Sequence, residues 1–280
     1  MRVIREGVVE RASAPRAFVP TMGSLHDGHR ALMREARRRV GERGEVVVSV
    51  FVNPTQFGEG EDFDAYPRDL DADIRVCEEE EVDTLFAPSI SQIYGEAALR
   101  TEPKVTVDPG PLGARWEGVE RPGHFTGVLT VVCILFHKVP ADFAVFGQKD
   151  YQQLVLVERM SRELGFGIEI VGVPTIRDHD GLALSSRNVY LDDEQRQLAA
   201  VIPQALKVAQ QEASQGAGHA VDAARSVLVE SGLDVDYVDV CAPDLGPAPK
   251  VGAARLLVAA HVGPVRLIDN CVLTLGRTAP

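Results

Sequence analysis

The feature that most constrains the fold of this chain is an alternation of short apolar segments with longer segments of helical period. The short segments are rich in β-branched and aromatic residues and occupy residues 16–20, 45–52, 83–88, 142–146 and 168–173. Helical periodicity lies between them, at residues 29–40, 69–81, 125–139 and 151–164. Apolar strands that alternate with helices are typical of a parallel sheet covered on both faces. The sequence therefore predicts an α/β fold over residues 1–175, with a Rossmann-like parallel sheet and helices on both faces.

The rest of the chain has a different pattern. We expect a long helix over residues 192–213, a flexible segment at residues 215–220 and a second helix near residues 220–230. Three apolar segments follow and are interpreted as antiparallel strands, at residues 234–240, 254–262 and 265–275. This pattern predicts a smaller C-terminal α+β domain over residues 176–280.

Charge and cysteine content limit the partners and the compartment. The 280 residues carry a formal net charge of −12, and an acidic surface repels phosphate backbones, so no nucleic-acid partner is expected. The cysteines fit no CxxC pattern and have the apolar surroundings of free thiols in a reducing compartment; they are Cys77, Cys133, Cys241 and Cys271. The longest apolar run, Val128–Phe136, is too short to cross a bilayer, and the N-terminus has no signal-peptide pattern. We expect a cytoplasmic protein with no membrane partner.

The first polar cluster follows the first apolar strand, in the stretch PTMGSLHDGHRAL at residues 20–32. In an open parallel sheet, ligands bind beyond the carboxyl ends of the strands, where loops meet helix N-termini. Gly23 and Gly28 allow close approach of the backbone, and His26 and His29 can donate hydrogen bonds to anionic oxygens. The chemistry suits a phosphate. An HxxH pair without further ligands at recognisable spacing is weak evidence for a metal, so no metal-binding residues are expected.

Two further polar clusters follow later strands. In FGQKDYQQ, at residues 146–153, Lys149 offers a positive charge for a phosphate and Gln153 offers an amide for a substrate. The third cluster, DGLALSSRN at residues 180–188, offers hydroxyls, backbone N–H groups and a guanidinium. Each cluster alone is also compatible with a solvated surface loop, and only their combination favours a nucleotide site.

The histidine pair and the Ser-rich basic loop together resemble the HIGH/KMSKS nucleotidyltransferase superfamily. Six stretches are further similar to the successive signatures of the pantothenate synthetase family, in that family's order and spacing. They run from residue 20 to residue 270 and read PTMGSLHDGH, VFVNPTQFGEGEDFDAYPR, RPGHFTGV, FGQKDYQQL, VGVPTIRDHDGLALSSRNVYL and RLIDN.

This resemblance implies an enzyme that condenses (R)-pantoate with β-alanine to give pantothenate, AMP and pyrophosphate. ATP and pantoate would first form pantoyl adenylate, with Mg²⁺ neutralising the departing pyrophosphate, and β-alanine would then displace AMP. The resemblance also implies a homodimer, and a C-terminal domain that closes over the ATP site.

The resemblance implies roles for individual residues as well. The family's catalytic residue would be His29, and the transition-state charge would be stabilised by His26, Lys149, Ser185, Ser186 and Arg187. The ATP site would comprise Met22, Gly23, Ser24, Leu25, His26, Asp27, Gly28, His29, Gly147, Gln148, Lys149, Asp150, Ile176, Leu184, Ser185, Ser186 and Arg187. Pantoate would be held by Gln56 and Gln153, with Asn53 and Tyr66 arranged around the same small hydroxy acid, and these four residues would form the site for pantoate and β-alanine.

Two positions depart from the family pattern. Gln148 stands where glutamate is common, and Leu184 stands where methionine is common; leucine preserves the volume of methionine, whereas Gln148 removes a negative charge beside Lys149. Three alternatives stay open. They are a related nucleotidyltransferase, a non-catalytic ATP-binding regulatory module whose sole sequence support is Gln148, and an aminoacyl-tRNA synthetase, which the acidic charge opposes.

Overall fold

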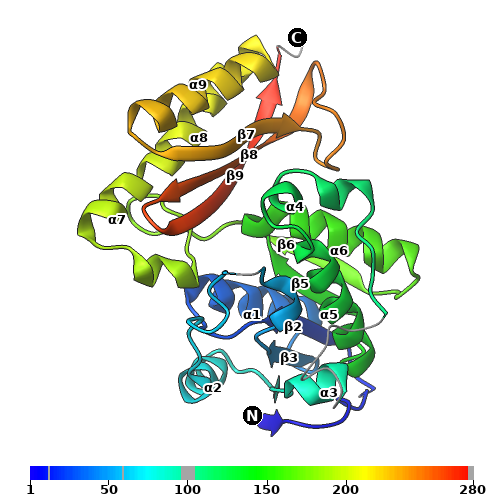
Figure 1. Ribbon diagram of the computed structural model, residues 1–280. Helices are drawn as coiled ribbons and strands as arrows, with labels where there is room; N and C mark the ends of the chain where they lie inside the picture. Colours follow the sequence, from blue (N-terminus) through cyan, green and yellow to red (C-terminus); the bar gives the residue numbers. More distant parts are fainter. Residues whose placement is uncertain (12, 59, 96–104, 277–280) are drawn as a thin grey trace. The chain divides into compact units, whose positions relative to one another are not determined.

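The computed structural model describes residues 1–11, 13–58, 60–95 and 105–276. The chain divides into two compact units (Figure 1). The first comprises Met1–Gln148 and Gln152–Pro174, and the second comprises Lys149–Tyr151 and Thr175–Pro280. The short segment Lys149–Tyr151 thus belongs by its contacts to the second unit, although its neighbours in sequence belong to the first.

A six-stranded parallel sheet forms the centre of the first unit, which confirms the predicted Rossmann-like sheet. The strand order is β1-β4-β3-β2-β5-β6. The strands are β1 (Arg2–Ile4), β2 (Arg16–Thr21), β3 (Glu45–Val50), β4 (Thr84–Phe86), β5 (Phe143–Gly147) and β6 (Glu169–Val173). The short edge strand β1 was not anticipated, because three residues are too few to show a period.

Helices cover both faces of this sheet, and alternate residues of the central strand show how (Figure 1). Ala17 and Val19 belong to one core cluster with α1 (Asp27–Val40) and α2 (Leu70–Glu79). Phe18 points to the other face, where its ring meets Phe136 of α5 (His124–Lys138) with centroids 6.5 Å apart. α6 (Tyr151–Glu163) covers that second face at β6, because Leu154 lies 2.8 Å from where Gly172 would carry a Cβ. The short helices α3 (Ile90–Tyr94) and α4 (Glu117–Glu120) complete this unit.

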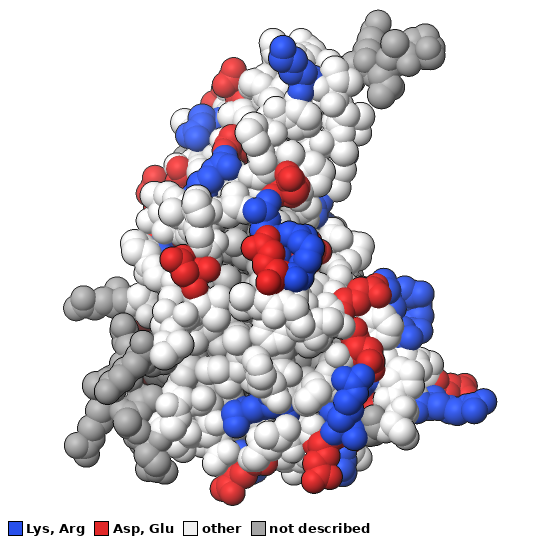
Figure 2. Space-filling model, turned by 90° about the vertical axis from the view of Figure 1, so that its right-hand side faces the viewer, with Lys and Arg blue, Asp and Glu red and all other residues white. Residues whose placement is uncertain are grey.

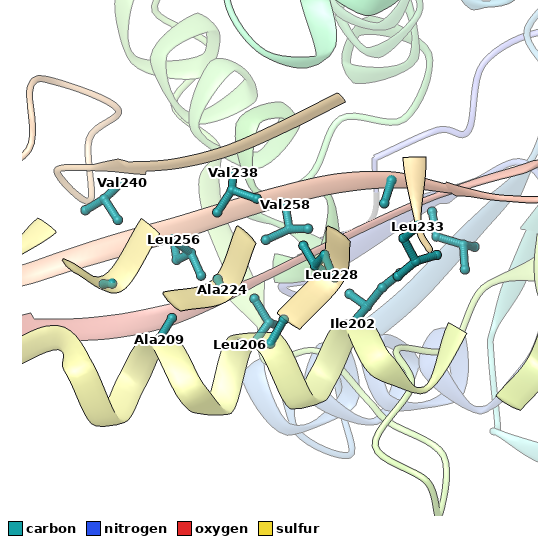
Figure 3. Packing of buried hydrophobic residues seen from close by; sticks show 14 of the residues in the cluster. Ile202, Leu206, Ala209, Ala224, Leu228, Leu233, Val238, Val240, Leu256 and Val258 are labelled. Atoms are coloured by element: carbon teal, nitrogen blue, oxygen red, sulfur yellow. The ribbon is translucent and has the colours of Figure 1, made fainter. Parts of the chain in front are cut away.

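The second unit is built on a three-stranded antiparallel sheet in the order β7-β8-β9, as predicted. The strands are β7 (Asp234–Cys241), β8 (Gly252–Val262) and β9 (Val265–Leu275). Figure 3 shows the core, in which α8 (Val201–Glu212) and α9 (Ala217–Glu230) pack on one face of the sheet. The strands contribute alternate side chains to this core, such as Val238, Leu256 and Val258. The helices contribute Ile202, Leu206, Ala224 and Leu228.

Two expectations for the second unit were wrong. The long helix predicted over residues 192–213 is two helices, α7 (Asp193–Ala199) and α8, which are separated at Ala200. Pro203 explains the break, because a proline ring clashes with the carbonyl four residues earlier in a continuous helix. The segment expected to be flexible forms the first turn of α9, which begins at Ala217 after Gly216 adopts a φ of +113°.

Charged side chains of both signs are interspersed on the face of the molecule shown in Figure 2. Between α1 and α2, for example, Arg34 forms a two-bond ion pair with Glu80 at 2.7 and 2.6 Å. All four cysteines are free. Among the described helices, none is both long enough and apolar enough to cross a membrane.

Candidate active site

The first polar cluster forms the N-terminus of α1, and its two histidines cap the helix. Nδ1 of His26 accepts a hydrogen bond from the backbone N–H of Gly28 at 3.1 Å. Nδ1 of His29 accepts one from the N–H of His26 at 3.2 Å, which completes a capping box. The centroids of the two imidazole rings lie 4.1 Å apart. Because a nitrogen that accepts a hydrogen bond carries no proton, each neutral ring has its hydrogen on Nε2.

This capping determines what the histidines can contribute. Each ring presents an Nε2–H donor near the start of a helix, where backbone N–H groups and the helix dipole already favour an anion. The helix was expected to begin near His29, but it begins at Asp27, because the imidazoles satisfy the first backbone donors. The site can therefore bind phosphate oxygens through neutral donors.

A buried carboxylate holds the loop that leads into α1. Asp73 of α2 accepts hydrogen bonds from the backbone N–H groups of Ser24 at 3.2 Å and Leu25 at 2.9 Å. Burial raises the pKa of this carboxyl group above its ordinary value, although the two backbone bonds oppose the rise. At Gly23 the φ angle is +80°, and an added Cβ would lie 2.7 Å from Oδ2 of Asp73. The loop therefore needs glycine at this position for both conformation and space.

The side chain of Gln56 lies against the same loop. Its Nε2 is 2.8 Å from Sδ of Met22, and its Oε1 accepts a hydrogen bond from Nδ2 of Asn53 at 3.2 Å. Asn53 is only 1% exposed, and its Oδ1 accepts a bond from the hydroxyl of Tyr94 at 2.6 Å. Its Nδ2 also donates to the carbonyl of Gly127 at 3.2 Å. The structure thus brings three predicted site residues together and gives Asn53 the part of orienting Gln56.

Arg121, just before α5, and His124, its first residue, hold the backbone of Gln56. The carbonyl oxygen of Gln56 accepts hydrogen bonds from Nδ1 of His124 at 2.8 Å and from Nη2 of Arg121 at 3.2 Å. Arg121 also forms a two-bond ion pair with Glu61, at 2.9 and 2.6 Å. Burial, together with the charge of Arg121, lowers the pKa of His124 to about 4. Gln56 is therefore held by a neutral imidazole.

The other two residues predicted to bind pantoate, Tyr66 and Gln153, have different surroundings. Tyr66 is 5% exposed, and its ring packs edge to face on Phe57 with centroids 5.9 Å apart. Gln153 lies half-buried in the first turn of α6. Its neighbour Gln152 is buried and serves the fold, because it donates to the carbonyls of Leu112 and Arg115 at 2.8 Å each.

Gln148 has a structural partner at its position after β5, which ends at Gly147. Its side-chain amide donates a hydrogen bond to the carbonyl oxygen of Gly172 in β6 at 3.3 Å. An ionised glutamate could not donate this bond, since a carboxylate only accepts. Gln148 therefore makes a contact in the fold that an ionised glutamate at this position would lose.

In the second unit, Lys149 and Asp150 lie in the single turn η4 (Gln148–Asp150). Nζ of Lys149 is 3.9 Å from Oδ1 of Asp150. The carbonyl oxygen of Lys149 accepts a hydrogen bond from the side chain of Asn270 in β9 at 2.9 Å. This segment is thus attached to the C-terminal sheet through its main chain.

The Ser-rich loop of the second unit follows a short hairpin. The N–H of Leu184 donates to the carbonyl of Ile176 at 2.9 Å, which places these two predicted residues opposite each other. The chain then enters η5 (Ser186–Tyr190), where Oγ of Ser185 accepts a hydrogen bond from the N–H of Arg187 at 3.3 Å. Ser185, Ser186 and Arg187 therefore form one tight turn that presents hydroxyls and a guanidinium.

Sequence reasoning assigned no role to several residues that hold the site. Asp73 lies in a segment interpreted only as a helix, and nothing in its spacing indicates a buried carboxylate. Arg121 and His124 belong to RPGHFTGV, and Asp269 and Asn270 belong to RLIDN. Both motifs were available as signals, but their contacts depend on segments far away in the sequence.

Comparison with known proteins identifies relatives over nearly the whole chain. The sequence profile of the family described as pantoate-beta-alanine ligase matches residues 2–272. The pantothenate synthetase of Nocardioides sp. is 54% identical over 271 residues, which cover 94% of this chain and 80% of that protein. The crystal structure of pantothenate synthetase from Thermus thermophilus is 48% identical, with a TM-score of 0.88 over 97% of this chain and 99% of that one.

A further solved structure carries ligands. The pantoate-beta-alanine ligase from Francisella tularensis, described as complexed with beta-gamma ATP and beta-alanine, is 32% identical to this chain. Its TM-score is 0.77, and the match covers 97% of this chain and 98% of that one.

Proposed function

Because the chain belongs to the pantoate–β-alanine ligase family and is an enzyme that joins these two substrates, we propose that it works through a pantoyl-adenylate intermediate. A carboxylate oxygen of pantoate attacks the α-phosphorus of ATP, the bond from that phosphorus to the bridging oxygen breaks, and pyrophosphate leaves. The amine of β-alanine then attacks the acyl carbon. The bond from that carbon to the AMP oxygen breaks, AMP leaves, and the new amide nitrogen loses its proton.

The observation that carries this proposal is the capping box formed by His26 and His29. Attack of a carboxylate on a phosphate brings two anions together, so donors whose bonds strengthen as charge develops lower the barrier. The two Nε2–H groups are such donors, because each Nδ1 accepts a backbone hydrogen bond. We assign the main catalytic contact to His29, with His26 beside it.

The remaining residues complete the proposed site. Lys149, Ser185, Ser186 and Arg187 supply positive charge and donors to the phosphates. ATP contacts Met22, Gly23, Ser24, Leu25, Asp27, Gly28, Gly147, Gln148, Asp150, Ile176 and Leu184. Gln56 and Gln153 bind pantoate, beside which β-alanine enters, Asn53 orients Gln56, and Tyr66 lines the same site. ATP and β-alanine are the ligands named for the related Francisella enzyme.

Mg²⁺ is proposed to enter with ATP, as part of the substrate. Among the residues that the structure describes, no group of three or more His, Cys, Asp or Glu side chains could hold a metal ion. Magnesium fits such a protein, because it keeps several waters and is bound mainly through substrate phosphates. When bound, it would neutralise charge on the departing pyrophosphate.

The setting of the enzyme is proposed from its composition and its family. The net charge of −12 supports a protein without a nucleic-acid partner, and the four free cysteines support a reducing, cytoplasmic compartment. We also propose a homodimer, and a C-terminal domain that closes over bound ATP during catalysis. Sedimentation of the purified protein tests the first of these, and protease protection with and without ATP tests the second.

Release of pyrophosphate by the purified enzyme tests the proposed reaction. With MgATP, release should require pantoate, stop after about one equivalent without β-alanine, and turn over when β-alanine is added. CTP in place of ATP is the control for nucleotide specificity. Pyrophosphate release that is independent of pantoate, or release of orthophosphate instead, would refute the proposal.

No observation favours a regulatory module without turnover. Its only sequence support was Gln148, whose amide has a structural partner in the carbonyl of Gly172. The donors required for adenylate formation are retained in this chain.

A further inference from the structure

Two adjacent residues of β9, Asp269 and Asn270, are buried although one is charged and the other polar. Asp269 is 3% exposed and Asn270 is 5% exposed. Successive side chains of a strand point to opposite faces of the sheet. Asp269 shares its face with Leu267 and Leu273, which pack in the core with α8 and α9, so Asn270 points to the other face.

Asp269 holds the hairpin that precedes the Ser-rich loop. Its two carboxylate oxygens accept hydrogen bonds from Nη1 and Nη2 of Arg177 at 2.6 and 3.0 Å. Nη1 of Arg177 also donates to the carbonyl of Gly181 across the hairpin at 3.0 Å. The pair is a bidentate ion pair with a buried carboxylate, a geometry that fixes the orientation of the guanidinium as well as binding it.

The ends of this hairpin are proposed nucleotide contacts. Arg177 pairs with Ala183 in an isolated antiparallel bridge, and Leu184 donates its N–H to Ile176. A shift of Arg177 would therefore move Ile176 and Leu184 together, and with them the turn that starts at Ser185.

Asn270 holds the other nucleotide segment of the second unit. Its Nδ2 donates to the carbonyl oxygen of Lys149 at 2.9 Å. Further contacts of the same compact unit fix the residues around it: the guanidinium of Arg255 lies 3.8 Å from the ring centroid of Tyr151, whose hydroxyl donates to the carbonyl of Pro243 at 2.8 Å. The hydrogen bond from Asn270 thus holds the main chain of Lys149 against β9, and the position of the main chain determines where the ammonium group can reach.

We propose that Asp269 and Asn270 are the positioning residues of the ATP site, which attach the Ser-rich loop and the Lys149 segment to two faces of one strand. This inference rests on the proposed function, because it concerns the residues assigned there to ATP. Neither residue is required to touch the nucleotide. Each sets the position of a group that does, and a displacement of about 1 Å in a catalytic group can lower a rate by roughly 100-fold.

The test compares two variants of this pair with a matched control on the same sheet. Asn270→Ala removes the bond to Lys149, and Asp269→Asn removes the charge that binds Arg177. Asp236→Asn is the control, because Asp236 has its partners within the sheet: it forms an ion pair with Arg266 of β9 at 2.6 Å and lies 3.5 Å from Nε2 of His261 in β8. Arg177→Lys keeps the charge but loses the two-bond geometry, and it replaces Asp269→Asn if that variant does not fold.

Three quantities are measured for each variant: the Kd for ATP by calorimetry, and the KM values for ATP and pantoate from pyrophosphate release. We expect Asn270→Ala to raise the ATP constants by about 5-fold and Asp269→Asn by about 10-fold or more, with the KM for pantoate within about twofold. Asp236→Asn should lower the melting temperature while leaving both KM values within about twofold. A control that raises the ATP constants as much as Asp269→Asn would overturn the inference, as would wild-type ATP constants in both β9 variants.

A double-mutant cycle tests the link from Asn270 to Lys149 directly. If Asn270 acts through Lys149, the change Asn270→Ala should have little further effect on ATP binding in a Lys149→Met background, whereas additive effects would refute the link. The calorimetric readout separates this inference from the proposed function. A wild-type enzyme that binds ATP but releases no pyrophosphate with pantoate would refute the function alone, while an active enzyme indifferent to both β9 variants would refute the inference alone.

Discussion

The substitution His29→Asn separates the two parts that His29 plays. The asparagine Oδ1 can accept the N–H of His26 in place of the imidazole Nδ1, which now accepts it at 3.2 Å. The variant therefore keeps the capping box but loses the Nε2–H donor. We expect the free energy of unfolding to change by less than about 0.5 kcal/mol, because the asparagine Oδ1 at this N3 position keeps the hydrogen bond that closes the capping box. The rate of adenylate formation should fall by about 100- to 1,000-fold, the loss found for one preorganised donor to a developing oxyanion, about 3 to 4 kcal/mol.

The comparison with His29→Ala isolates the capping contribution. Alanine loses both the Nε2–H donor and the acceptor for the N–H of His26, so it should show the same kinetic loss together with a destabilisation of about 1 kcal/mol, the typical contribution of one hydrogen bond. Single-turnover pyrophosphate release with saturating ATP and pantoate measures the rate, and urea denaturation measures the stability. If His29→Asn retained activity within tenfold of the wild type, the role assigned to Nε2 of His29 would be wrong.

Three other substitutions test the fold around the site. Gly23→Ala should lower the free energy of unfolding by roughly 2 kcal/mol in a urea titration, because the new Cβ would lie 2.7 Å from Oδ2 of Asp73. The control Gly41→Ala has a similar positive φ but open space around the Cβ, so it should lose about half as much. Equal losses in the two variants would contradict the steric reason. The pKa of His124 is about 4 in the folded chain and near 6.5 when unfolded, so only the unfolded chain gains a proton there as the pH falls. Stability should therefore decrease by up to about 1.4 kcal/mol per pH unit from about pH 6.5 to pH 4, and His124→Asn should flatten this slope; an unchanged slope would assign it to other groups. Gln148→Glu should lose about 1 kcal/mol of stability, because the carboxylate cannot donate to the main chain of β6; a stabilised variant in thermal denaturation would refute this.

Much of the fold could be predicted because its signals are local. The apolar strands at residues 16–20, 45–52 and 142–146 needed only their period and their spacing to indicate a parallel sheet. The break within residues 192–213 was missed, although Pro203 is visible in the sequence, because apolar periodicity continues across it. A proline is well tolerated in the first turn of a helix. Pro203 therefore indicated that a second helix begins near residue 201.

The candidate site was predictable only in part, for a similar reason. His26, His29 and the serine pair lie in short motifs whose residue types indicate their chemistry. That both imidazoles accept backbone hydrogen bonds through Nδ1 follows from three-dimensional geometry. The partners Asp73, Arg121 and Asn270 act on segments 48 or more residues away, as in the bond from Asn270 to Lys149. No periodicity or spacing encodes such contacts.

The pantoyl-adenylate mechanism is tested most directly by following oxygen from pantoate into the products. The enzyme is supplied with pantoate labelled with ¹⁸O in its carboxylate, together with MgATP and β-alanine, and the AMP is examined by mass spectrometry. We expect AMP to carry one labelled oxygen, because the carboxylate oxygen that attacks the α-phosphorus stays on AMP when the amide forms. Unlabelled AMP, with the label in orthophosphate or pyrophosphate instead, would show attack at another phosphorus and would contradict the pantoyl-adenylate mechanism.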